Sequence, residues 1–124
     1  MMWLLVGVGG ALGSMARYGI TQAAGLWLPA GFPFSTFIVN AVGCAVFGVL
    51  AGAGERSGVM TPALRAFCLT GVLGGFTTFS AFSHDNVVLA RDGAWGLALV
   101  NAAGQLIVGV AAVAAGWWAA RSLA

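Results

Sequence analysis

The sequence predicts an all-α integral membrane protein in which residues 1–124 form a single domain of four transmembrane helices. The composition is the first reason: 60% of the residues are hydrophobic, 6% are charged, and the mean hydropathy is +0.99. These values lie far outside the range of soluble domains. The second reason is that four apolar runs divide the chain, and the third is that tryptophans lie near the ends of these runs, where interfacial rings are common.

Each apolar run is long enough to cross a membrane. A helix rises 1.5 Å per residue, so a hydrocarbon core of about 30 Å requires about 20 residues. The first run has no small-residue cleavage site, which favours a retained span over a signal peptide. The expected spans are approximately Trp3–Gly25, Phe34–Ala53, Pro62–Ala90 and Ala94–Ala120.

Several other classes of protein are disfavoured by the charges and cysteines. The net charge is only +2, which gives too little basic surface for a nucleic-acid partner. Cys44 and Cys68 both fall within apolar runs, where cysteine usually behaves as a small buried hydrophobe rather than as a disulfide or metal ligand.

Glycines recur four residues apart within the expected spans, a spacing that lets helix backbones approach closely. The pairs are Gly9 and Gly13, Gly48 and Gly52, and Gly71 and Gly75.

The arginines give only a weak signal for membrane orientation. Four spans place both termini and the second loop on one side, with Arg56, Arg121 and Arg65, against Arg91 and Arg17 on the other. Such a near balance gives little positive-inside bias. The chain is therefore expected to insert in both orientations and to pair as an antiparallel homodimer.

The third expected span contains signals for a break in the middle of the membrane. As a straight helix its length would exceed roughly 40 Å, which leaves residues to spare. Gly74 and Gly75 weaken the helix, and the hydroxyls of Thr77 and Thr78 compete for backbone carbonyls. Unwinding there frees carbonyl oxygens, which are suitable ligands for a cation such as Na⁺.

Phenylalanines and hydroxyl residues alternate along the same span. Phe76, Phe79 and Phe82 lie three residues apart, a spacing that ordinarily indicates core packing. Here hydroxyl side chains lie between them. Ring edges are electropositive and hydroxyls donate hydrogen bonds, so the combination favours a small anion. The interleaved hydroxyl residues are Thr77, Thr78, Ser80 and Ser83.

Two polar residues lie deep in the first two spans. Asn40 is roughly 10 Å inside the second span, where an amide needs a helix partner or lines a path. Arg17 is the only full charge in the first span, and it either snorkels to the interface or raises the anion concentration at a vestibule.

Three strings resemble the Fluc, or CrcB, family of bacterial fluoride channels over nearly the whole chain. They are "GGALGSMARYG", "FPFSTFIVNAVGCAVFG" and, most specifically, "GVLGGFTTFSAFS". The resemblance implies a channel in the bacterial inner membrane that exports fluoride passively and so relieves fluoride toxicity. It further implies a dual-topology antiparallel homodimer with two pores and a central structural Na⁺.

The resemblance also assigns roles to particular residues. Phe79, Phe82 and Asn40 match pore residues of the family, and Arg17 matches a vestibule arginine. Thr78 and Ser80 are candidates for the polar track of the pore. Backbone carbonyls of Gly74 and Thr77 from both subunits would hold the Na⁺.

Two features depart from the family pattern. Its fourth span commonly carries hydroxyls that face the pore, whereas this chain has Asn101 and Gln105 on one helical face. The family often has a glutamate soon after the third-span string, where this chain has Asp85 behind His84, and the role of this pair stays open.

A small multidrug exporter is the main alternative, since it has a similar length and number of spans. Proton-coupled export of a cationic drug needs an intramembrane carboxylate, and Asp85 is the only acid in a position to serve. An enzyme would have to rest on His84 and Asp85, which point about 100° apart on a helix and form no dyad. A purely structural membrane protein is the remaining alternative.

Overall fold

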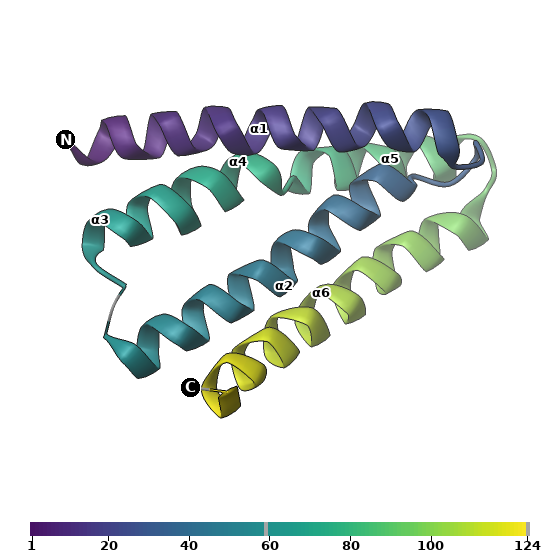
Figure 1. The fold of residues 1–124 in the computed structure, drawn as a ribbon. Coiled ribbons are helices and arrows are strands. Elements are labelled where there is room, and N and C mark those ends of the chain that lie inside the picture. The colour runs from purple at the N-terminus through teal and green to yellow at the C-terminus, as the bar shows by residue number, and fades with distance from the viewer. Residues whose placement is uncertain (59, 124) are drawn as a thin grey trace.

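The computed structural model describes residues 1–58 and 60–123, and these residues contain helices and connections but no strand. Figure 1 shows the start of α1, the end of α2, the start of α3 and the end of α6 at one end of the molecule. The connections from α1 to α2 and from α5 to α6 lie at the opposite end. The elements are α1 (Met2–Trp27), α2 (Phe34–Ser57), α3 (Pro62–Arg65), η1 (Ala66–Leu73), α4 (Gly74–Phe76), α5 (Phe79–Arg91) and α6 (Trp95–Leu123).

Three segments of the described chain are long and apolar enough to cross a membrane, namely Phe34–Ser57, Pro62–Arg91 and Trp95–Ser122. The prediction of an all-α, multi-pass membrane protein is therefore confirmed. The 26-residue helix α1 is long enough but less apolar, because it contains many glycines and Arg17. Helix α2 continues past the expected Ala53 and stops where Gly58 adopts a left-handed conformation, with φ of 64°.

The third segment starts with a capped turn and then leaves α-helical geometry twice. Thr61 accepts a hydrogen bond from the amide of Leu64 at the start of α3. The next stretch, η1, is a π-helix, which is uncommon and is often found at functional sites. Helix α4 ends at Phe76, and helix α5 begins at Phe79.

Thr77 and Thr78 separate α4 from α5. Their backbones are extended, with φ and ψ of −79° and 160° at Thr77 and −151° and 118° at Thr78. Gly74 and Gly75, which the sequence also marks as weak points, remain helical. The interruption therefore falls on the residues whose side-chain hydroxyls can replace helical hydrogen bonds.

Glycines bring α1 onto η1 and α2 onto α6. A Cβ atom placed on Gly13 would collide with the carbonyl oxygen of Val72, and one placed on Gly48 would collide with that of Val113. Gly9, Gly52, Gly71 and Gly75 also face backbone atoms of a neighbouring helix at 2.4–3.0 Å from the position of a Cβ. The close approach predicted from the glycine spacing is confirmed.

The buried core is small and lies around the break. Val39, Leu69, Leu73 and Phe76 are at most 9% exposed, so Phe76 is the one of the three spaced phenylalanines that packs in the core. Large apolar side chains cover much of the outer surface, as expected for helices that face lipid.

Candidate functional site

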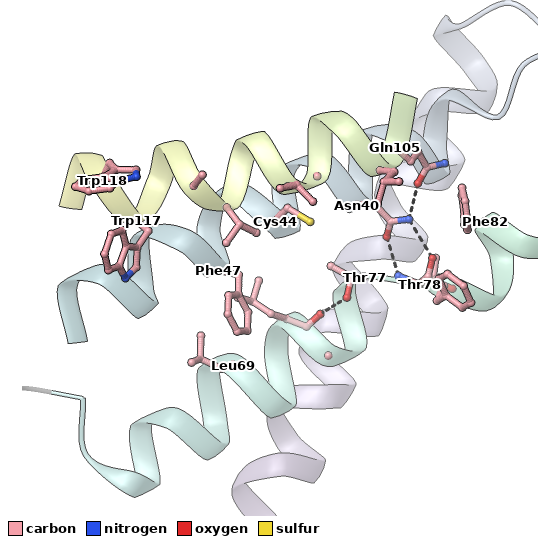
Figure 2. Close-up of a pocket in the computed structure, with 18 residues that line it drawn as sticks. Asn40, Cys44, Phe47, Leu69, Thr77, Thr78, Phe82, Gln105, Trp117 and Trp118 are labelled. Carbon is pink, nitrogen blue, oxygen red and sulfur yellow. Dashed lines mark hydrogen bonds between the residues drawn. The ribbon is translucent and has the colours of Figure 1, made fainter. Parts of the chain in front are cut away.

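A cavity of about 830 Å³ lies beside the break in the third segment. Figure 2 shows its wall formed by side chains from α2, α6 and the segment around the break. Its apolar end reaches Trp117 and Trp118, and its polar end includes Gln105. Six of the residues that the sequence marks for the pore or the break line this cavity: Asn40, Gly74, Thr77, Thr78, Phe79 and Phe82.

Asn40 joins α2 to the break by a two-point contact with the backbone of Thr78. Its Oδ1 accepts a hydrogen bond from the amide of Thr78 at 2.8 Å, and its Nδ2 donates to the carbonyl of Thr78 at 3.0 Å. The same Nδ2 donates to Oε1 of Gln105 at 2.8 Å. Asn40 therefore makes the polar contact between helices that one interpretation of its amide predicts, and it also lines the cavity.

The hydrogen-bonded chain continues along α6. Nε2 of Gln105 donates to Oδ1 of Asn101 at 2.9 Å, as the predicted shared face allows. Asn101 is completely buried, and its Nδ2 has no hydrogen-bond partner among the described residues. In this amide relay each group donates to the next, from the Thr78 amide through Asn40 and Gln105 to Asn101. The unused donor at the end of the relay is therefore Nδ2 of Asn101.

Two backbone carbonyls at the break are left without hydrogen bonds. The amide of Thr78 would extend α4 by donating to the carbonyl of Gly74, but it donates to Asn40 instead. The amide of Ala81 donates to Oγ1 of Thr78 at 3.2 Å, and not to the carbonyl of Thr77. Within the described residues, neither the Gly74 nor the Thr77 carbonyl accepts a hydrogen bond.

The carbonyls of Leu73 and Gly75 are satisfied. The carbonyl of Leu73 accepts from both the amide and the hydroxyl of Thr77, each at 2.9 Å. The carbonyl of Gly75 accepts from Nε of Arg17 at 3.1 Å and from Oγ of Ser14 at 3.4 Å. The carbonyls of Gly74 and Thr77 therefore differ from these two neighbours in being open.

The two predicted pore phenylalanines differ in exposure. The ring centroids of Phe79 and Phe82 lie 5.5 Å apart, and Phe79 is 78% exposed while Phe82 is half-buried. Ser80 is exposed, and its Oγ lies 3.3 Å from Oγ1 of Thr78. Aromatic edges and hydroxyls are thus adjacent at the start of α5.

Arg17 lies outside the main cavity. It lines a second, more polar cavity of about 460 Å³ between α1, α2 and α5, together with Thr36, Thr78 and Asp85. Nδ1 of His84 is 4.0 Å from Oδ1 of Asp85, and Oδ2 of Asp85 is buried with no partner among the described residues. The structure thus separates Arg17 from the phenylalanine pair, with Thr78 contributing to both cavities.

Some of these contacts had no signal in the sequence. The bond from Arg17 to Gly75 joins residues 58 positions apart, and the pairing of Asn40 with Thr78 joins residues 38 positions apart. The buried, unpaired Oδ1 of Asn86 was also not foreseen, and neither was Cys44 in the main cavity. Only homologous structures or an alignment would reveal such long-range pairs from the sequence.

Side chains offer no ready-made metal centre in the part of the chain that the structure describes. No group of three or more His, Cys, Asp or Glu residues there is arranged to hold a metal ion, and Cys44 and Cys68 are both free. A cation bound near the break would therefore have to use uncharged oxygens, from the backbone or from hydroxyl and amide side chains.

Comparisons with known proteins agree with these observations. The model of the family described as "CrcB-like protein, Camphor Resistance (CrcB)" matches residues 4–117. A protein of Paracoccus denitrificans is 46% identical over 121 residues, which are 98% of this chain and 95% of the relative. A protein of Nitratidesulfovibrio vulgaris is 44% identical over 108 residues, 87% of each chain. A third, from Rhodospirillum centenum, is 44% identical over 115 residues, 93% of this chain and 91% of the relative. All three are named "Fluoride-specific ion channel FluC". This chain belongs to the CrcB family.

Proposed function

We propose that this protein is a fluoride-selective channel that lets fluoride leave the cell passively and so relieves fluoride toxicity. The observation that carries the proposal is the position of Phe79 and Phe82 beside the hydrogen-bonding groups of the break, in one cavity. Relatives over nearly the whole length of the chain bear the name of fluoride channels. The protein is accordingly a channel rather than an enzyme.

Fluoride is small and strongly hydrated, so its passage requires groups that replace water one after another. We assign this task to the ring edges of Phe79 and Phe82 and to the hydroxyls of Thr78 and Ser80. Asn40 forms the pore wall beside them, and its amide would reach fluoride by exchanging its bond to Gln105 for one to the anion. Helix α5 adds to them because its N-terminus, at Phe79, carries the positive end of the helix dipole. None of the residues that line the main cavity is an arginine, so no full charge traps the anion there.

Arg17 serves this path from the second cavity. Arg17 lines a polar pocket together with Thr78 and Asp85, where its charge would raise the local concentration of anions. We assign this pocket to a vestibule that is continuous with bulk water.

We further propose that four spans, including α1, form each subunit of a dual-topology antiparallel homodimer in the bacterial inner membrane, with the break at mid-membrane. Open backbone carbonyls are costly in hydrocarbon unless protein or an ion covers them. Gly74, with its open carbonyl, and Ser80 are exposed on the single chain, so these polar groups have to be shielded from lipid. A second copy of the chain would shield them with the same polar groups of its own.

The topology is testable with C-terminal tags. Accessibility of the tag from both faces of the membrane in one population of cells would agree with dual insertion. A tag that is labelled from one face alone would refute it.

A structural Na⁺ is the cofactor that the open carbonyls suit. Oxygen atoms are the preferred ligands of small hard cations, and unwound membrane helices hold Na⁺ in this way. Gly74 and Thr77 each offer one carbonyl free of helical hydrogen bonds, and two subunits would offer four. The bound ion would neutralise the carbonyl dipoles and fix the break.

The alternative of a proton-coupled multidrug exporter has no support in the comparisons. The main cavity is also lined by no carboxylate, since Asp85 lies in the second cavity. An exporter of cations requires an acid in contact with its substrate.

Flux from proteoliposomes, measured with a fluoride electrode, tests the proposed function. Purified protein should release fluoride passively and reject chloride, and Phe79→Ile and Phe82→Ile should impair this release. Phe34→Ile is the matched control, because Phe34 lies outside the cavity. Its ring packs against that of Phe32 in a tilted arrangement, with the centroids 4.8 Å apart. Equal chloride flux, or no fluoride flux from folded protein, would overturn the proposal.

A further inference from the structure

The contact between Asn40 and Thr78 links the anion path to the carbonyl group of Gly74. In an unbroken α-helix, the amide of Thr78 would donate to the carbonyl of Gly74. Thr78 donates to Oδ1 of Asn40 instead, at 2.8 Å. The side chain of Asn40 thus competes directly with helix formation at the residue whose carbonyl is left open.

The orientation of the Asn40 amide is fixed by its partners. A backbone amide only donates and a backbone carbonyl only accepts, so the contact with Thr78 places Oδ1 towards the Thr78 amide and Nδ2 towards the Thr78 carbonyl. The second hydrogen of Nδ2 is used by Oε1 of Gln105. Both hydrogens of the Asn40 amide are committed in this arrangement, which makes the side chain a clamp on the break as well as a part of the cavity wall.

The clamp is itself anchored. Gln105 is held by Asn101, which is 0% exposed and therefore cannot move out of the way. This relay connects α6, through Gln105 and Asn40, to the extended backbone of Thr78.

We propose that Asn40 is the positioning residue of the cation site: by holding the Thr78 amide it keeps the Gly74 carbonyl available to Na⁺. The second open carbonyl, that of Thr77, does not depend on Asn40, because Oγ1 of Thr78 occupies the competing amide of Ala81. The inference rests on the proposed Na⁺ site and on the antiparallel dimer, in which Gly74 of both subunits contributes. It gives Asn40 a role in the cation site in addition to its place in the cavity wall.

The expected effect follows from the competing hydrogen bond. If Asn40 is replaced by leucine, the Thr78 amide is released to the Gly74 carbonyl, where it competes with Na⁺ for the lone pairs of that oxygen. A net hydrogen bond of about 1 kcal/mol corresponds to about a fivefold loss of affinity per subunit. A site that uses both subunits then weakens about 25-fold.

The experiment measures the midpoint of thermal unfolding of the purified dimer, followed by tryptophan fluorescence, as Na⁺ replaces N-methylglucamine at constant ionic strength. Bound Na⁺ stabilises the native dimer by RT ln(1 + [Na⁺]/Kd), so a fit of the midpoint against the Na⁺ concentration gives the Kd. Asn40→Leu should raise this Kd by about 25-fold. Gln105→Met is the matched control: it removes the bond to Asn40 Nδ2 but leaves the Thr78 amide on Oδ1, so its Na⁺ dependence should stay within about twofold of the unmodified protein.

Each outcome decides the matter. An unchanged Na⁺ dependence in Asn40→Leu overturns the inference, and so does a loss in Gln105→Met equal to that in Asn40→Leu, because general loosening of the relay would then explain both. If Asn40→Leu does not fold, Asn40→Asp replaces it, since its carboxyl keeps an acceptor for Thr78. A lost Na⁺ response in Asn40→Asp overturns the inference, and a retained response supports it.

Fluoride flux is measured separately, so the two proposals can fail independently. Fluoride flux without any effect of Na⁺ on the unmodified protein overturns this inference and the Na⁺ site but leaves the channel intact. The predicted pattern of Na⁺ dependence without fluoride flux would overturn the proposed function alone.

Discussion

Gly13 is the position where a single methyl group should do most damage to the break. A Cβ atom there would collide with the carbonyl oxygen of Val72 and would lie 2.8 Å from the amide nitrogen of Phe76. Both are backbone atoms, so neither can swing aside as the end of a long side chain would. Gly13→Ala therefore has to push α1 away from η1 and α4.

Gly13→Ala should lower both the stability of the fold and the fluoride flux. Overpacking of this kind destabilises a fold by about 1–3 kcal/mol. In addition, the next residues of α1 are the ones that hold the carbonyl of Gly75, through Ser14 at 3.4 Å and Arg17 at 3.1 Å. A displaced α1 lengthens both bonds, so we expect fluoride flux to fall together with stability.

Gly7→Ala is the control on the same helix. No atom lies within 4 Å of a Cβ placed at Gly7, so alanine there should be neutral or should gain about 0.5–1 kcal/mol from its greater helix propensity. The free energy of unfolding of both variants is measured in detergent, and flux is measured in proteoliposomes. A Gly13→Ala protein as stable and as active as Gly7→Ala would refute the close packing of α1 on the break.

Two further predictions concern charged residues. Arg17→Gln should lower fluoride flux more than Arg17→Lys, because lysine keeps the charge and loses only the Nε bond to Gly75. The glutamine variant should also make the flux less dependent on ionic strength. Equal losses in both variants would show that Arg17 acts only by holding the break. At the other end of the molecule, Oε2 of Glu55 accepts from Nε1 of Trp117 at 3.0 Å and lies 3.5 Å from Arg121. Glu55 and Arg121 are exposed, so Glu55→Ala should cost less than about 1 kcal/mol in chemical unfolding, and a larger loss would show that the contact is shielded from water.

The sequence was informative where the signal is local. Hydropathy located the helices because each expected span contains its own apolar residues, and the glycine spacing identified the faces of α1 and α2 that meet another backbone. Helix ends were less predictable: α2 continues to Ser57 because the left-handed turn at Gly58, and not the composition, ends it. The π-helix η1 had no recognisable signal, since its residues would fit an α-helix equally well.

The site was predictable only as a set of residue types. Asn40 stood out because an amide is costly inside a membrane span, and the threonine pair stood out because hydroxyls compete for backbone carbonyls. The hydrogen bonds of Asn40 with Thr78 and of Arg17 with Gly75 depend on how the helices pack. No local sequence pattern predicts them. The surroundings of Asp85 and His84 are likewise set by the second cavity and by no motif.

The break also places groups suited to the two proposed ions, of opposite charge, on one segment. Elements α3, η1 and α4 form one continuous helical stretch that ends at Phe76, and the negative end of its dipole lies in the last turn, which contains the open carbonyl of Gly74. Helix α5 begins at Phe79, and the positive end of its dipole adjoins the phenylalanine pair. Because only Thr77 and Thr78 separate these two ends, a cation at the carbonyls would balance the charge of a nearby anion that passes Phe79. Removal of the break, rather than of any one side chain, is therefore the change that should abolish the affinity for both ions at once.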